Sequence, residues 1–176
     1  EIRRCLVGSE MCIRDRMSVV IRKANKEDMP EVLELIKELA VYEKQPNAVQ
    51  IDVDTLACEG FGNQPLFTCF VSLLEGQIVG MALCYFRFST WKGRTVHLED
   101  LIVKESKRGQ GVGMALYKKV MEHAASFNVK RVEWVVLGWN TPAIKFYEKT
   151  GATILKDWYL AQFDQEGLSH FITPSC

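Results

Sequence analysis

The 176-residue sequence lacks several features that would assign it to a special class of protein. It has no net charge, because 22 Lys and Arg residues balance 22 Asp and Glu residues. No overall field therefore draws it to nucleic acid or to an anionic membrane. It also contains no apolar run close to the roughly 18 residues of a membrane-spanning helix. We expect neither nucleic acid nor membrane as a partner, and any charge selectivity must be local.

The cysteines lack the arrangements by which cysteine usually signals a function. None forms a CxxC pair, and no histidine lies near enough in the sequence to complete a set of zinc ligands. Single cysteines among apolar neighbours are typical of small core residues in a reducing compartment. This description fits all six, which are Cys5, Cys12, Cys58, Cys69, Cys84 and Cys176. The sequence predicts a cytoplasmic protein without a metal site.

The first sixteen residues, EIRRCLVGSEMCIRDR, lack the periodicity of a helix or a strand. Their only apolar run, Cys5-Leu6-Val7, is too short for the apolar region of a signal peptide. The segment resembles a translated cloning sequence, so we expect a non-native or disordered tail over residues 1–16, with a structural tail as the alternative. The length and globular composition of residues 17–176 predict a single domain.

Strand and helix patterns alternate along this domain. An amphipathic helix begins after Asn25, which can cap it, and reaches about Glu43. A hairpin is expected at residues 66–88, with its turn at Glu75-Gly76. The other expected elements are strands at 19–21, 95–104, 131–137 and 152–163, and helices at 52–61, from about 111 onward, and at 141–149. A hairpin followed by strand–helix units predicts an α/β fold with a mixed central sheet and helices on both faces.

Two adjacent carboxylates, Glu99 and Asp100, interrupt an otherwise apolar strand pattern. A buried carboxylate is costly unless it is paired, so packing alone rarely keeps two. Regular alternation along the strand predicts two faces. One face would carry Val96, Leu98, Asp100 and Ile102, and the other His97, Glu99, Leu101 and Val103.

A loop with three glycines, Arg108-Gly109-Gln110-Gly111-Val112-Gly113, follows this strand and precedes a helix. The first N–H groups of a helix are unpaired and attract an anion, and glycine lets the backbone approach a phosphate closely. The loop does not match the Walker or the Rossmann glycine pattern. A simple strand-to-helix turn is the alternative to a phosphate site.

The loop does match the pattern Arg/Gln-x-x-Gly-x-Gly/Ala. A second segment, residues 139–152 (WNTPAIKFYEKTGA), matches N-x-x-A/S-x-x-F/Y-Y-x-x-x-G-F/A. With both motifs in this order, the chain resembles the GNAT acetyltransferase superfamily over essentially residues 17–171. The resemblance implies the GNAT acyl-CoA N-acyltransferase fold and acetyl-CoA as co-substrate. It also implies cofactor contacts at Leu101, Ile102, Val103, Arg108, Gly109, Gln110, Gly111, Val112, Gly113, Met114, Asn140 and Ala143.

Three short segments, LAVYE, STWKGR and LEDL, are similar to one subgroup of that family, which contains spermidine/spermine and thialysine acetyltransferases. The STWKGR loop lacks the acidic character of the polyamine enzymes and looks more like the thialysine member. The similarity implies a homodimer and a small cationic diamine as substrate, bound by Tyr42, Glu43, Glu99 and Trp91. Trp91 could instead only anchor its loop.

Transfer of an acetyl group to an amine requires an amine that has lost its proton, and alkylammonium groups have a pKa of about 10. Glu99 could act as the base, directly or through a water. The resemblance implies that Tyr147 protonates the coenzyme A thiolate, although Tyr147 could also be a core residue. His97 is either a second titrating group or a satisfied, partly buried histidine, and Asp100 is interpreted as a structural partner of a backbone or cationic group.

Direct attack by the amine is simpler than a relay through Cys69 or Cys84, since neither cysteine has a paired base in the sequence. The expected function is acetyl-CoA-dependent N-acetylation of a small polyamine or a lysine-like diamine. A second interpretation replaces the substrate by an amine of a protein or peptide. A third is a coenzyme A-binding sensor without turnover, against which the presence of both Glu99 and Tyr147 argues.

Overall fold

The computed structural model describes residues 19–173. Contacts between residues divide the chain into two compact units, with the boundary between Val135 and Val136. The first unit holds the sheet, and the second holds two helices. The expected tail at residues 1–16 lies outside the described residues, and the single domain over residues 17–176 stays a prediction.

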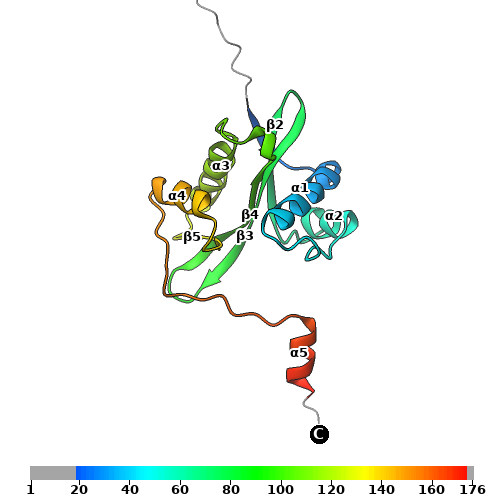
Figure 1. Ribbon diagram of the computed structural model, residues 1–176, viewed down its shortest axis with the longest axis vertical. Coiled ribbons are helices and arrows are strands. Elements are labelled where there is room, and N and C mark those ends of the chain that lie inside the picture. Colours follow the sequence, from blue (N-terminus) through cyan, green and yellow to red (C-terminus); the bar gives the residue numbers. More distant parts are fainter. Residues whose placement is uncertain (1–18, 174–176) are drawn as a thin grey trace, which may run out of the picture. The chain divides into compact units, whose positions relative to one another are not determined.

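The first unit is built on a five-stranded sheet in which the strands follow one another in chain order (Figure 1). The first four strands pair antiparallel, and the fifth pairs parallel to the fourth. This confirms the mixed sheet expected from the sequence. The strands are β1 (Val20–Lys23), β2 (Thr68–Leu74), β3 (Gln77–Ser89), β4 (Gly93–Val103) and β5 (Val132–Glu133).

Helices cover both faces of this sheet, as predicted (Figure 1). The first face is covered by α1 (Met29–Tyr42) and α2 (Val53–Phe61), and the second by α3 (Val112–Ser126). Two short 3-10 turns, η1 (Lys26–Asp28) and η2 (Glu105–Lys107), precede α1 and α3. The core under α1 contains Met29, Val32, Leu35, Val71, Met81, Leu83 and Ile102.

The predicted cap residues begin the helices. The Asn25 side chain accepts a hydrogen bond from Asp28 N at 3.1 Å, and the Asp28 carboxylate accepts one from Asn25 N at 2.8 Å. This reciprocal capping box satisfies two N–H groups that would otherwise be unpaired. Asp52, which was not predicted as a cap, accepts from Thr55 N at 2.8 Å at the start of α2. Both helices form where the sequence predicted them.

One irregularity in β4 overturns the regular alternation predicted for this strand. Leu98 pairs with Cys84, but Asp100 pairs with Leu83, so Glu99 is an extra residue without a partner position on β3. Such a bulge shifts the alternation by one residue. Asp100 and Ile102 therefore share a face with His97, and not with Leu98 as predicted. They face α1, since Ile102 belongs to the core under that helix.

The buried strand expected at residues 131–137 was also predicted wrongly in its length. Only Val132 and Glu133 pair with β4, opposite Val96 and His97, and both are half-buried. Beyond them Val135 is exposed. The apolar run Val132–Leu137 resembles a buried strand, but ladder hydrogen bonds require a neighbour at the right distance, and pairing with β4 ends after two residues.

The second unit contains α4 (Thr141–Lys149) and α5 (Gln165–Ile172). The bounds of α4 are those predicted, and Asn140 caps it as expected by accepting from Ala143 N at 3.3 Å. The strands predicted within residues 152–163 are wrong, because the described part of this unit contains no strand with which they could pair. The sequence analysis missed α5, although Asp164 caps it by accepting from Gly167 N at 2.7 Å.

Candidate active site

The glycine loop leaves β4 and leads into α3 through two residues with left-handed backbone conformation. Gly109 has φ of 75° and Gly111 has φ of 83°, values that residues with a side chain rarely adopt. A Cβ atom added at either position would meet no other atom. The loop therefore presents bare backbone to open space, as a ligand that approaches the main chain requires.

The N-terminus of α3 is the second part of this arrangement. Gly111 stands at the N-cap position, and no side chain caps the helix there. The first N–H groups of α3 and the positive end of its dipole can therefore act on an anion. Val112 is buried, whereas Gln110 is exposed and Met114 is largely exposed.

Arg108 ties this loop to two other predicted site residues. Its Nε donates to Val103 O at 3.0 Å, at the end of β4. Its guanidinium carbon lies 5.0 Å from the centre of the Tyr42 ring, within the range of a cation–π contact. The structure thus brings the predicted cofactor loop and the C-terminal end of α1 together.

A cluster of three carboxylates, formed by Glu43, Glu99 and Asp100, lies at the same end of the first unit. Burial, and to a lesser extent the negative charges of Glu99 and Glu43, raise the pKa of Asp100 to about 6. Burial also raises the pKa of Glu43. Within the described residues, no cationic side chain forms an ion pair with Asp100, and its interpretation as a structural partner of a backbone or cationic group stays a prediction. The cluster is therefore suited to attract a cationic ligand.

Two side chains from neighbouring positions contact Glu99. Tyr85 on β3 lies close to the Glu99 carboxylate; burial raises the pKa of Tyr85, and the interaction with Glu99 raises it further. His97 Nε2 lies 3.6 Å from Glu99 Oε2, which confirms that His97 and Glu99 share a face. Sequence reasoning missed Tyr85, because its place beside Glu99 depends on the register of β3 and on the bulge.

A chain of charged residues continues from His97 across the sheet. Arg87 Nη1 lies 3.3 Å from His97 Nδ1, and the same atom forms an ion pair with Glu133 Oε1 at 2.7 Å. Arg131 Nε lies 2.8 Å from Glu133 Oε2, but it makes no hydrogen bond within the described chain. This contact is therefore an ion pair without hydrogen-bond geometry. Arg87, Glu133 and Arg131 were not singled out in the sequence.

The edge of β4 beyond β5 carries three further predicted residues. Pairing with β5 ends at His97, and β4 continues to Val103. In the described sheet no strand follows on that side, so the backbone groups of this edge are open to an extended ligand, apart from Val103 O, which accepts from Arg108 Nε. Leu101 is half-buried there, while Ile102 and Val103 are buried.

Tyr147 lies in the second unit, whereas Glu99 lies in the first. Tyr147 is 8% exposed and packs edge-on against Phe146, with ring centres 5.3 Å apart. Its carbonyl oxygen accepts from the Thr150 hydroxyl at 2.6 Å, which closes the end of α4. Ala143 and Asn140 lie at the opposite end of this helix. The burial of Tyr147 accords with a core residue, and its predicted role as an acid stays a prediction.

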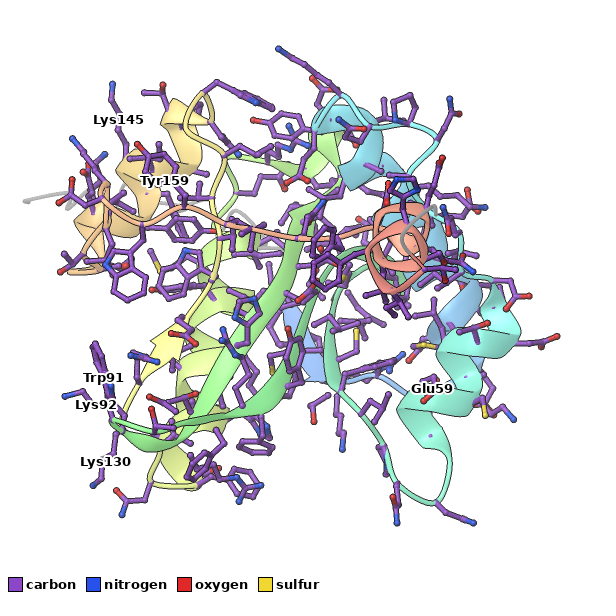
Figure 2. The ribbon with its side chains drawn as sticks, turned by 90° about the horizontal axis from the view of Figure 1, so that it is seen from below. Glu59, Trp91, Lys92, Lys130, Lys145 and Tyr159 are labelled. Carbon is purple, nitrogen blue, oxygen red and sulfur yellow. The ribbon has the colours of Figure 1, made fainter. Side chains whose placement is uncertain are left out.

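The structure does not bring Trp91 to the carboxylates. Trp91 is 77% exposed in the turn between β3 and β4, where Figure 2 shows it with Lys92 and, beside them, Lys130. Glu99 lies six positions after Gly93 in β4, which corresponds to about 20 Å along a strand. The contact of Trp91 with substrate stays a prediction, and the other predicted possibility is that it anchors its own loop.

Two of the cysteines considered as nucleophiles are buried in the sheet. Burial raises the pKa of the Cys69 thiol to about 12 and that of the Cys84 thiol to about 11. Both thiols therefore stay protonated at neutral pH, and a thiol is a much weaker nucleophile than a thiolate. This favours direct attack by the amine over a relay through cysteine.

Among residues 19–173, no group of three or more His, Cys, Asp or Glu side chains is arranged to hold a metal ion. In the same part of the chain, no helix combines the length and the apolar character needed to cross a membrane.

Together these features define an α/β protein with a glycine loop at an uncapped helix N-terminus, an open strand edge and a carboxylate cluster. The sequence model of the Acetyltransferase (GNAT) family matches residues 29–152 of this chain. The chain belongs to this family of acetyltransferases, and its fold is the GNAT fold.

Similar proteins agree with this assignment. A thialysine N-epsilon-acetyltransferase from Bos taurus is 39% identical over 161 residues, which cover 85% of this chain and 95% of that protein. The human spermidine/spermine N(1)-acetyltransferase-like protein 1 is 34% identical over 84% of this chain and 23% of its own length. Among solved structures, an integron cassette protein of V. cholerae has a TM-score of 0.73 and 25% identity, with 89% of this chain and 98% of that chain covered.

Proposed function

We propose that this N-acetyltransferase transfers the acetyl group of acetyl-CoA to a primary amine of a small polyamine or a lysine-like diamine, of the thialysine type. The carboxylate cluster is the observation that carries the proposal: Glu43, Glu99 and Asp100 concentrate negative charge without a cationic partner at Asp100. A diammonium substrate would supply the missing positive charges. The similarity to thialysine and spermidine/spermine acetyltransferases supports the same substrate class.

The loop at residues 108–113 is suited to the diphosphate of acetyl-CoA. Gly109 and Gly111 expose backbone to open space, and α3 begins without a side-chain cap, so its N–H groups can donate to phosphate oxygens. Leu101, Ile102 and Val103 on the open edge of β4 would hold the pantetheine part through the main chain. Gln110, Val112, Gly113 and Met114 belong to the loop and to the first turn of α3. Asn140 and Ala143 remain proposed cofactor contacts on the strength of the family resemblance.

Glu99 would remove the proton from the substrate ammonium, directly or through a water. The neutral nitrogen then attacks the thioester carbonyl, a C–N bond forms, the C–S bond breaks, and the nitrogen releases its second proton to solvent to become the amide. Tyr147 would donate its proton to the departing thiolate, and the tyrosinate recovers a proton from solvent. Tyr85 lies beside the Glu99 carboxylate and would help to position it. The protonated thiols of Cys69 and Cys84 support a direct transfer without an acyl-cysteine.

Glu43 would bind the second ammonium group of the substrate, next to Tyr42. This division of roles makes a dication a better substrate than a monoamine, because each carboxylate pairs with one charge. Trp91 would contribute to substrate binding only if the substrate, or a second copy of the chain, reaches the turn between β3 and β4.

A panel of amines tests the proposal. Thialysine, lysine, spermidine, a monoamine and a peptide with a free N-terminus are each incubated with acetyl-CoA, and acetylated product is measured by mass spectrometry. The small diamines should react with the highest kcat/KM. Preference for the peptide would favour a protein amine as substrate, and binding of coenzyme A without any product would favour a sensor.

Glu43→Gln separates substrate binding from chemistry. We expect KM for the diamines to rise about fivefold, as loss of one partly exposed ion pair predicts, with KM for the monoamine unchanged. Glu38→Gln, at an exposed position of the same helix, is the matched control and should leave both values unaltered. Equal effects of Glu43→Gln on diamine and monoamine would refute the role of Glu43.

We further propose that the protein acts in the cytoplasm as a homodimer. The reduced cysteines Cys58, Cys69 and Cys84 support a reducing compartment. The second unit exposes large apolar side chains that a second copy could cover, namely Leu155, Trp158, Tyr159, Leu160, Phe163, Phe171 and Ile172. Light scattering coupled to size-exclusion chromatography should give twice the mass of the 20.1 kDa chain.

A further inference from the structure

The His97 ring lies between a cation and the proposed catalytic base. Its Nδ1 is 3.3 Å from Arg87 Nη1, and its Nε2 is 3.6 Å from Glu99 Oε2. The ring packs against Tyr85 with centres 5.2 Å apart, and the His97 side chain is only 12% exposed. These contacts leave the imidazole little freedom to turn, so each nitrogen keeps its own neighbour.

The neighbour of Nδ1 determines where the imidazole carries its proton. A guanidinium group has donors and no acceptor, and it stays charged at any physiological pH. Nδ1 can therefore interact favourably with Arg87 only if it accepts the hydrogen bond. A neutral imidazole that accepts at Nδ1 carries its proton on Nε2, which is the nitrogen that faces Glu99.

We propose that Arg87 and His97 act as positioning residues for Glu99: Arg87 holds His97 as the neutral tautomer with its proton on Nε2, and this N–H group faces the Glu99 carboxylate. The inference rests on the proposed role of Glu99 as the base. It goes beyond that role, because it excludes His97 as a proton acceptor. One nitrogen already carries a proton, and Arg87 occupies the other.

The surroundings of Arg87 keep it in this position. Glu133 on β5 forms an ion pair with the same Nη1 atom at 2.7 Å, so the guanidinium is held between β5 and His97. The titratable and charged groups around the ring are Tyr85 and Arg87 from β3, Glu99 from its own strand and Glu133 from β5. Burial lowers the pKa of His97, and Arg87 lowers it further, whereas Glu99 and Glu133 oppose this.

The neutral state of His97 matters for the charge of the site. An imidazolium at this position would form an ion pair with Glu99 and cancel the charge that attracts the ammonium substrate. It would also stabilise the carboxylate and weaken it as a base. With Arg87 in place, Glu99 keeps its full charge, and the proton that it removes from the amine must leave through solvent.

Nuclear magnetic resonance can detect this tautomer without any substrate. The chain has three histidines, so a long-range ¹H–¹⁵N spectrum of the imidazole nitrogens is simple, and His97→Phe assigns the signals of His97. In the wild-type protein at pH 7 we expect a protonated Nε2 and an unprotonated Nδ1. A proton on Nδ1, or an imidazolium, would overturn the proposal.

Arg87→Met removes the donor and the charge, and Arg131→Met is the matched control, since it removes a charge from the same Glu133 without touching His97. Arg87→Met should give a mixture of tautomers and a higher pKa of His97. Arg131→Met should retain the single tautomer, and Arg87→Lys should restore it in part. Equal spectra of Arg87→Met and wild type would refute the role of Arg87.

The pH dependence of kcat/KM for the best diamine shows whether the tautomer matters for catalysis. Arg87→Met should lose activity as the pH falls below 7, through one additional ionisation at the pKa measured for His97, while Arg131→Met should follow the wild-type profile. A profile of Arg87→Met that parallels the wild type would refute the effect on Glu99. Failure of the wild type to acetylate any amine would refute the proposed function instead, and the tautomer would still be measured.

Discussion

Glu43, the residue after α1, and Asp100, in β4, lie close enough for the charge of Glu43 to raise the pKa of Asp100. The two residues come from different elements, and the bulge at Glu99 turns Asp100 toward the face that α1 covers. Acidic side chains from a helix and a strand therefore converge, and the protein maintains this arrangement at a cost in stability.

That cost should be measurable through the pH dependence of folding. The pKa of Asp100 is about 6 in the folded chain, against 3.8 for an unperturbed aspartate. Between these values the folded state binds a proton that the unfolded state has released, so rising pH destabilises the protein. We expect Asp100→Asn to remove a loss of up to about 3 kcal/mol between pH 4 and pH 7.

Urea unfolding of wild type and Asp100→Asn at several pH values measures this difference. The free energy of unfolding of the variant should exceed that of the wild type increasingly from pH 4 to about pH 6.5 and by a constant amount above it. Curves that stay parallel over the whole range would show that Asp100 titrates normally.

Substitution of Asp28 should change the free energy of unfolding in the opposite direction to substitution of Asp100. Hydrogen bonds from Arg22 lower the pKa of this buried carboxyl, although burial opposes them. Its stabilising effect is thus present above the pKa of an unfolded aspartate and is lost as the pH falls through the lower folded value. Asp28→Asn should lower the free energy of unfolding at pH 7 by about 2 kcal/mol.

The same urea experiment tests Asp28. Wild type and Asp28→Asn should approach each other in stability as the pH falls toward 3. At pH 7 Asp28→Asn is the less stable of its pair, whereas Asp100→Asn is the more stable of its pair. A constant gap between pH 3 and pH 7 would contradict the assignment of the lowered pKa to Asp28.

The glycine loop offers a matched pair of substitutions. Gly111 has φ of 83°, so Gly111→Ala should destabilise the fold by about 1–2 kcal/mol. Gly113 lies in the first turn of α3, and a methyl group there would meet only Val103 Cγ2, at 3.7 Å. Gly113→Ala should instead stabilise the helix by about 0.5–1 kcal/mol.

Thermal and urea unfolding distinguish the two substitutions, and calorimetric titration with coenzyme A adds a functional measurement. Gly111→Ala should weaken binding of the nucleotide because it changes the course of the loop. Unaltered affinity and stability in Gly111→Ala would show that the left-handed conformation is not required.

Tyr147→Phe tests the proposed acid. The ring remains, so the buried packing against Phe146 is kept. We expect kcat to fall by about 100-fold or more, as for loss of a general acid, with little change in the affinity for coenzyme A. Tyr159→Phe, at a position 93% exposed in the same unit, serves as the control and should retain turnover. Full turnover of Tyr147→Phe would assign Tyr147 to packing alone.

Local signals account for the parts of the fold that the sequence predicted correctly. The bounds of α4 follow from the cap at Asn140, the proline after it and Gly151 beyond its end. The capping box at Asn25 and the turn at Glu75-Gly76 gave α1 and the hairpin in the same way. Each of these signals acts within a few residues, so no knowledge of the tertiary structure is required.

The parts that were predicted wrongly depend on distant partners. Apolar alternation in residues 132–137 and 152–163 is compatible with strands, but a strand exists only where another strand presents its hydrogen-bonding groups. The bulge at Glu99 is a single extra residue relative to β3, and alternation within β4 alone cannot reveal it. The contacts of Tyr85 and Arg87 with the site depend on that same register.

The extra residue in β4 also separates two tasks that a regular strand would couple. Before the bulge, pairing with β3 determines the orientation of His97. After the bulge, the register is shifted by one residue and determines the orientation of Asp100 and Ile102. Deletion of Glu99 would make the ladder continuous and reverse the orientation of one half relative to the other. Residues on one side of the bulge could therefore be exchanged to change the selectivity for the amine substrate, while the residues on the other side keep their packing.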